Sequence, residues 1–323
     1  GSLLYHWRIL RPGPSPPRLQ TSSMAASEPL PHFIDEVLRY LHEVHPTEAA
    51  LDGVHAHDDL LEDGRRQAFD AEARALAGYL RRLDDIAADS LNPIERLEHR
   101  MMGSSLRGRM HEIESVRSWE RNPHFYADLL ATSLASQTLF GYAPQAERAR
   151  RVLSKLRQVP RFIDAARDNV KEPVGIFVKV GIETFRGALS FIERDLPRAF
   201  SEVDDLHLLG DLADAQTEAS QVIGAYIDDL EKDLAPKAKA SFRLGRDSFE
   251  QKLKLEEGIA LGVERLLAIA TRELNETQEA FRSAAGKIAG KQDRSDPKSV
   301  WASVKADHPA PGQLARVGTE QLA

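Results

Sequence analysis

This sequence lacks several features, and each absence excludes a class of protein. The 323 residues include no cysteine, which excludes disulfide bonds, thiolate metal sites and cysteine nucleophiles. No stretch approaches the ~18 continuous apolar residues of a membrane-spanning helix. Basic residues are outnumbered, with 43 Lys and Arg against 50 Asp and Glu. A net charge of −7 gives no electrostatic footprint for nucleic acid. We therefore expect a cytoplasmic protein with neither a nucleic-acid nor a membrane partner.

The composition that remains is that of a folded protein. Hydrophobic residues make up 42% of the chain and charged residues 29%, a balance typical of globular domains. The length is sufficient for more than one packed unit.

The first 27 residues differ from the rest. The stretch from Gly1 to Ser23 contains four prolines and no acidic residue. Gly1 and Ser2 resemble a cloning remnant, and Met24 resembles a natural start. We expect residues 1–27 to be a disordered tag or upstream leader. A short basic amphipathic targeting peptide is the alternative.

Helical signals dominate from residue 28 onward. Asn92-Pro93 and Asn122-Pro123 are typical helix starts, and Glu95 is placed to complete a capping box with Asn92. The segment 174–180 has strand propensity, but its neighbours are helical, so we favour a buried helix there. Apolar periodicity predicts further helices, among them 67–89, one from 93 towards Trp119, 208–234 and 263–288.

The longest predicted helix, 263–288, carries an apolar stripe at near-heptad spacing. Such a stripe suits one arm of a long antiparallel helix pair. Convincing alternation of apolar and polar residues is missing from the chain. The sequence therefore predicts an all-α fold, a multi-helix array of long antiparallel helices that forms one wall of a cleft. The stripe comprises Val263, Leu267, Ala270, Leu274, Thr277, Phe281, Ala284 and Ile288.

Histidine is the residue type that a metal or general-base site would need. His42 and His45 are three residues apart, whereas the zincin motif HExxH needs a spacing of four to put both on one helix face. We therefore expect surface or capping roles for them, and a surface role for His111. The weak candidates for metal ligands are His55, His57 and Asp58, which would converge on a strand. No strand signal surrounds them, so we expect a structured loop in which His55 and Asp58 bond to the backbone, and no metal site in this chain.

Other catalytic signatures are missing from the sequence. We find no GxSxG motif and no glycine-rich phosphate loop, and we predict no catalytic residue in this chain. The pair Ser154-Lys155 lies within a helical pattern. The cationic run from Arg148 to Arg151 is expected on a solvated helix face.

Four stretches carry a resemblance to a known family. They are LDGVHAHDDLLED at 51–63, WERNPHFYADLL at 119–130, SFRLGRDSFEQKLKLEEG at 241–258 and LLAIATRELNE at 266–276. Together they resemble the bacterial "domain of unknown function 885" family, whose members look like helical gluzincin-type zinc metallopeptidases with a deep substrate cleft. The resemblance implies a hydrolase acting on peptides or peptide-like amides.

The resemblance also implies a zinc ion, but no ligand for it in this sequence. The family's zinc motif, a HEGxPGHH-like sequence, lies well after the SFRLG-like block. We therefore expect residues 28–323 to be the amino-terminal helical portion of such a protein, truncated before the zinc motif and inactive alone. No cofactor is expected in this chain, and its expected partners are the missing carboxy-terminal half or a second copy.

Two functions remain open from the sequence. The first is the amino-terminal half of a zinc metallopeptidase-like hydrolase with a peptide-like substrate. The second is a non-enzymatic all-helical scaffold or protein-interaction module. Arg243 is the speculative substrate-binding residue, because a guanidinium holds a carboxylate through paired hydrogen bonds. A structural salt bridge to a nearby acid is the alternative role for Arg243.

Overall fold

The computed structural model describes residues 29–290 and 296–322. The predicted disorder of residues 1–27 lies outside the described residues. The chain divides into two units, one ending at Ile259 and one beginning at Ala260, and each is described by itself. Among the described helices, none combines the length and the apolar composition that a membrane-spanning helix requires.

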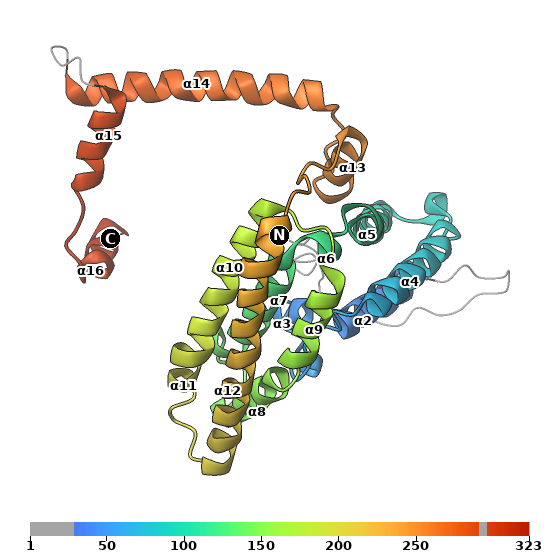
Figure 1. Cartoon of the computed structure of the whole chain (residues 1–323). Helices are drawn as coiled ribbons and strands as arrows, with labels where there is room; N and C mark the ends of the chain where they lie inside the picture. The colour runs from blue at the N-terminus through green and yellow to red at the C-terminus, as the bar shows by residue number, and fades with distance from the viewer. Residues whose placement is uncertain (1–28, 291–295, 323) are drawn as a thin grey trace. The chain divides into compact units, whose positions relative to one another are not determined.

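Every regular element in the described part of the chain is helical (Figure 1). One isolated bridge joins Val174 to Ala240. The all-α prediction is therefore confirmed. The segment 174–180 begins helix α10 (Gly175–Ser190), as the helical interpretation predicted.

The first core cluster of unit 1 joins three helices, α2 (Leu30–Val44), α4 (Arg66–Asp84) and α5 (Pro93–His111). Apolar side chains repeat at helical spacing along one face of α2, and this face is buried against the other two helices. Between α2 and α4 the chain forms the short helices α3 (Pro46–Leu51) and η2 (His55–His57). The buried residues of the cluster are Leu30, Phe33, Ile34, Val37, Leu41, Leu76, Leu83, Ile86, Met102 and Leu106.

The second core cluster is larger and lies among the helices that follow. Helix α10 packs closely on α7, and α12 packs on α8, α9 and α10; α10 and α12 are the two long neighbouring helices in Figure 1. Aromatic rings meet edge to face across this core, as in Phe185 and Tyr226 at 5.3 Å. The remaining bounds are α6 (Ser118–Arg121), α7 (Pro123–Leu139), α8 (Gln145–Leu156), α9 (Val159–Asn169), α11 (Leu196–Ala199) and α12 (Leu206–Asp229).

The sequence predicted where the helices begin more accurately than where they end. Asn92 caps α5, and the reciprocal bond from Glu95 completes the capping box. Helix α5 does not run on to Trp119 as predicted. It ends at His111, continues as one π turn (Glu112–Val116) and breaks at Arg117, whose backbone is left-handed (φ 56°). Helix α4 likewise ends at Asp84, short of the predicted residue 89.

The segment 241–259 lies on α5. Its helix α13 (Arg246–Glu256) contacts α5, and Ser104 Oγ donates to the Leu255 carbonyl at 2.8 Å. His111 Nε2 lies 3.1 Å from the Ser248 carbonyl. The predicted surface role of His111 is therefore wrong, because α13 covers this histidine and leaves it buried.

Unit 2 contains the longest helix, α14 (Val263–Ala289), followed by α15 (Pro297–Ala306) and α16 (Leu314–Leu322). The predicted bounds of 263–288 are nearly those observed. Helix α15 contacts α14, and the Phe281 and Trp301 rings meet at 6.3 Å. Most of the apolar stripe stays exposed, including Leu267 at 65% and Leu274 at 57%.

Gly181 is expected to be essential to the α7–α10 contact. A Cβ atom there would lie 2.9 Å from the backbone nitrogen of His124, closer than real Cβ contacts allow. Gly187 on the same helix has open space around it. We predict that Gly181→Ala lowers the free energy of unfolding, whereas Gly187→Ala raises it by up to about 1 kcal/mol through helix propensity. Urea denaturation of both variants measures this, and equal effects would contradict the close contact.

Candidate functional site

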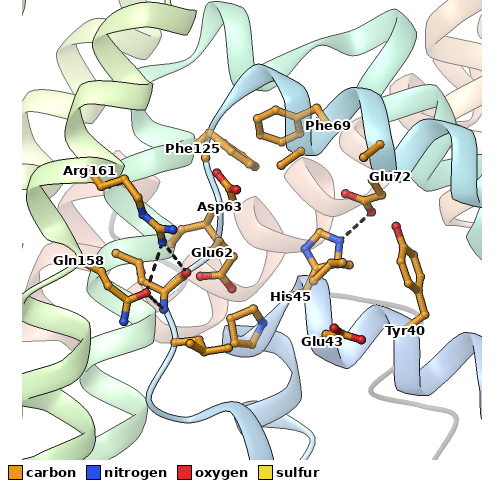
Figure 2. A pocket seen from close by; sticks show the side chains of 18 residues that line it. Tyr40, Glu43, His45, Glu62, Asp63, Phe69, Glu72, Phe125, Gln158 and Arg161 are labelled. Carbon is orange, nitrogen blue, oxygen red and sulfur yellow. Dashed lines mark hydrogen bonds and ion pairs between the residues drawn. The ribbon is translucent and has the colours of Figure 1, made fainter.

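The candidate site is a cavity of about 480 Å3 between the two core clusters of unit 1. Its volume lies within the range of small-molecule sites, about 300–1,000 Å3. Residues from the end of α2, the 60–64 loop, α4, α7 and the start of α9 line it. Phe69 and Phe125 supply apolar wall between the polar groups of the two sides (Figure 2). The lining residues are Tyr40, Glu43, Val44, His45, Pro46, Leu60, Leu61, Glu62, Asp63, Gly64, Ala68, Phe69, Ala71, Glu72, Phe125, Leu129, Gln158 and Arg161.

One side of the cavity is held by a histidine–glutamate pair. His45 Nε2 lies 2.7 Å from Glu72 Oε1 and joins the α2–α3 junction to α4. Burial disfavours the imidazolium, but the hydrogen bond and charge of Glu72 outweigh it and raise the pKa of His45. Burial and the charge of Glu72 raise the pKa of Tyr40 to about 12, so its hydroxyl stays protonated. His45 has the capping position that was predicted, as the C-cap of α2 and the N-cap of α3, but its side chain bonds to Glu72 and caps neither helix.

Two of the cavity's carboxylates are bonded within the protein. Both oxygens of Glu62 accept from Thr47, one from the backbone nitrogen and one from the hydroxyl, each at 2.8 Å. Asp63 accepts from the Arg65 guanidinium through both oxygens, at 2.8 and 2.6 Å, and this contact lowers the pKa of Asp63. These contacts fix the position of the loop that carries both acids.

The opposite side of the cavity carries Gln158 and Arg161 (Figure 2). The Arg161 guanidinium makes only two long contacts, to the Leu61 carbonyl at 3.4 Å and to Gln158 Oε1 at 3.3 Å. It forms no ion pair among the residues that the structure describes, although its charge helps to lower the pKa of the Asp63 carboxyl. Arg161 therefore keeps most of its donors for another molecule.

The predicted loop site around His55, His57 and Asp58 is a different kind of cluster. Asp58 is buried and accepts from His55 Nδ1 at 2.9 Å and from Arg151 Nη1 at 2.6 Å. The His55 ring stacks on Tyr142 at 3.7 Å. We predicted a loop whose side chains bond to backbone, but Asp58 instead joins a side-chain network. His57 does not contact Asp58 in that network.

The described side chains can be compared with the ligand set that a bound metal ion needs. Among residues 29–290 and 296–322, no three His, Asp or Glu side chains are grouped to hold a metal ion. His55 and Asp58 are already committed to each other and to Arg151. The residues present therefore do not fit the zinc that the family resemblance implies.

Two cations in α8 were not recognised from the sequence as buried groups. Arg148 donates to the carbonyls of Ala143 and Gln137 at 3.0 and 2.8 Å, so its predicted solvated position is wrong. Lys155 is 0% exposed and its Nζ donates to Ser133 Oγ at 2.7 Å. Their burial could have been predicted from helical periodicity, because both residues fall on the apolar face of α8.

Arg243, the residue predicted to bind substrate, lies outside the cavity lining. Its side chain is exposed and its guanidinium lies 5.5 Å from the centre of the Phe242 ring. The structure gives it no acidic partner within the described part of the chain, so the alternative salt bridge is not observed. The substrate role of Arg243 stays a prediction.

Comparisons with known proteins identify a family and a solved structure with a similar fold. A family model described as "Bacterial protein of unknown function (DUF885)" matches residues 46–319. A solved structure from Shewanella oneidensis, described as "a putative lipoprotein of unknown function", is similar with a TM-score of 0.73 and 20% identity. The match covers 91% of this chain and 56% of that chain, so this chain spans little more than half of that protein. No curated protein matches significantly.

The His45–Glu72 pair yields a pH prediction. A raised histidine pKa stabilises the fold fully below the unfolded value of about 6.5 and loses this effect as pH rises through the folded value. We expect Glu72→Gln to lower the His45 pKa, measured by NMR titration. The loss of stability should be larger near pH 5.5 than near pH 8. Asp70→Asn on the same helix is the control, and an unchanged His45 pKa in Glu72→Gln would contradict the pairing.

The buried Lys155 yields a second prediction, in which stability depends on pH in the opposite direction from the His45–Glu72 pair. Burial lowers the pKa of Lys155, so the unfolded chain binds more protons between the folded and unfolded pKa values, and stability rises with pH there. Lys155→Met should therefore raise the melting temperature at pH 7 and lose this advantage towards pH 10. Lys179→Met, on the exposed side of α10, should change little at either pH. A strongly destabilised Lys155→Met protein at pH 7 would show that the charge is well compensated.

Proposed function

Since this chain belongs to the bacterial DUF885 family, we propose that it forms the helical, substrate-binding portion of a metallopeptidase-like hydrolase. The substrate class in this proposal is a peptide or peptide-like amide. The family description itself states no activity. The proposal therefore depends on the cavity in unit 1 and on the motif resemblance.

The single observation that supports the proposal best is the composition of the cavity. Its aromatic and aliphatic wall, with Phe69, Phe125 and Leu129, suits the side chains of a peptide. Polar groups on two sides, Arg161 and the His45–Glu72 pair, suit the polar backbone and ends of the same molecule. A mixed lining of this kind fixes orientation as well as affinity.

In this proposal the zinc is held by further residues of a longer protein, and the cavity forms part of one wall of the cleft. Zinc would polarise the scissile carbonyl and activate water. No residue of this chain is assigned to that chemistry, because the described side chains offer no ligand cluster. The present residues would bind and orient the substrate.

The exposed stripe of α14 is the second observation on which a function can be argued. Leu267, Leu274 and Ile288 are all more than half exposed, and apolar side chains gathered on one exposed helix face are typical of an interaction site. We propose that further residues of the longer protein, the carboxy-terminal half, cover it. A second copy of this chain is the alternative partner for the stripe.

The stripe also favours the second candidate function, a helical scaffold or interaction module, in which it binds another protein and no hydrolysis occurs. A cytoplasmic location remains a prediction.

Hydrolysis by the longer, zinc-loaded protein tests the proposal. Ala71 is exposed on α4 and lines the cavity, so Ala71→Trp should fill the cavity without disturbing the core. We expect the longer protein to hydrolyse short peptides, and Ala71→Trp to raise KM about tenfold or more by excluding substrate.

Gln67→Trp is the matched control for this experiment. Gln67 is exposed on the same helix and is not a lining residue. The KM of the Gln67→Trp variant should therefore equal that of the wild type. Absence of zinc-dependent hydrolysis across a peptide library would reject the hydrolase and favour the scaffold. Hydrolysis with an unchanged KM in Ala71→Trp would keep the hydrolase and place its substrate elsewhere.

A further inference from the structure

The charged side chains around the cavity can be sorted by the partners they already have. Glu62 is bonded to Thr47, and Asp63 to Arg65. His45 and Glu72 hold each other at 2.7 Å. These contacts give each of the four residues a hydrogen-bond partner within the protein, although Thr47 does not neutralise the charge of Glu62.

Two charged lining residues, Arg161 and Glu43, are exposed and form no ion pair within the described part of the chain. Glu62 forms no ion pair there either, but it is buried and both its oxygens accept from the neutral Thr47. Arg161 makes only long contacts to neutral oxygens, at 3.3 and 3.4 Å. Glu43 is exposed and has no hydrogen-bond or ion-pair partner among the residues that the structure describes. Within the residues that the structure describes, one exposed cation and one exposed anion that form no ion pair therefore line the same cavity.

These two residues lie on different sides of the cavity. Figure 2 shows Arg161 beside Gln158 on one side and Glu43 near Tyr40 and His45 on the other. Phe69 and Phe125 lie between the two sides. A ligand that spans the cavity would meet a positive group, an apolar wall and a negative group in turn.

We propose that the cavity selects a short zwitterionic molecule with free ends, of dipeptide size, by reading both termini. Arg161 binds the carboxylate, because a guanidinium presents paired donors to two carboxylate oxygens. Glu43 binds the ammonium group, and the aromatic wall receives the side chains. The volume of about 480 Å3 accommodates a ligand of this size.

This inference rests on the proposed function for the site's location but adds the substrate's end groups. It makes the cavity an exopeptidase-like selector of short free peptides, as opposed to a channel for internal segments of long chains. Arg161 takes the carboxylate-binding role that the sequence assigned to Arg243. The acidic and basic ends of the cavity also predict which end of the peptide enters on which side.

Calorimetric titration of this chain with three probes tests the inference. The probes are Leu-Leu, its amide, which lacks the carboxylate, and its N-acetyl derivative, which lacks the ammonium group. Wild-type protein should bind Leu-Leu at least about tenfold more tightly than either blocked probe, since each loses one charge-assisted contact.

Two variants test which residue binds the carboxylate of the dipeptide and which binds its ammonium group. Arg161→Gln should abolish the preference for Leu-Leu over its amide and keep the preference over the N-acetyl form. Glu43→Gln should do the reverse. Arg157→Gln and Glu183→Gln are exposed controls outside the cavity, and both should retain the wild-type pattern. Circular dichroism of each variant checks that the fold is unchanged.

The outcomes separate this inference from the proposed function. No saturable binding of Leu-Leu by the wild type at about 10 mM, or preferences that survive both cavity variants, would overturn the inference. Hydrolysis of end-blocked peptides by the longer protein would then still support the hydrolase. Conversely, the crossed pattern of preferences without hydrolysis by the longer protein would support the selector and reject the hydrolase.

Discussion

The cavity depends on how firmly the 59–64 loop is anchored between the two core clusters. Asn169 Nδ2 donates to the Gly64 carbonyl at 2.6 Å and to Tyr126 Oη at 2.8 Å. Gln158 holds the other end of the loop through the Asp59 carbonyl at 2.8 Å. Buried backbone groups need such partners, because an unpaired carbonyl costs free energy comparable to a lost hydrogen bond. The loop is thus held by residues at the two ends of α9, and its position sets one side of the cavity.

The same loop carries the carboxylates that organise its surroundings. Glu62 accepts from the first turn of α3, where unpaired backbone N–H groups favour an anion. Asp58 neutralises Arg151 from a buried position. Burial by itself raises the pKa of Asp58, but nearby donors, led by Tyr142, lower it overall. The acids of the LDGVHAHDDLLED stretch therefore act mainly in structure, while Arg161 and Glu43 remain available for a ligand.

Much of the fold could be predicted from local signals. Asn92 and Asn122 mark helix starts because a side-chain oxygen must satisfy the first free N–H groups of a helix. The stripe from Val263 to Ile288 marks one long helix because its apolar period is helical. The end of α5 could not be predicted in this way, because the π turn and the left-handed Arg117 have no distinctive local signature.

The candidate site was hidden from sequence reasoning for a physical reason. Its charged residues come from segments up to 118 positions apart, from Glu43 to Arg161, and only tertiary packing brings them together. His45 was predicted at the surface or at a helix cap, and His111 at the surface. Nothing local shows that Glu72 pairs with the first and that α13 covers the second. By contrast, the family was already indicated by the four motif stretches.

Hydrogen exchange measured by mass spectrometry tests the central claim, that the cavity in unit 1 is the ligand-binding site, most directly. Saturating Leu-Leu should slow backbone amide exchange in residues 40–46, 60–72 and 158–163, which contribute the lining, and leave α14 unchanged. Protection confined to other segments, or no protection in these three, would contradict the account.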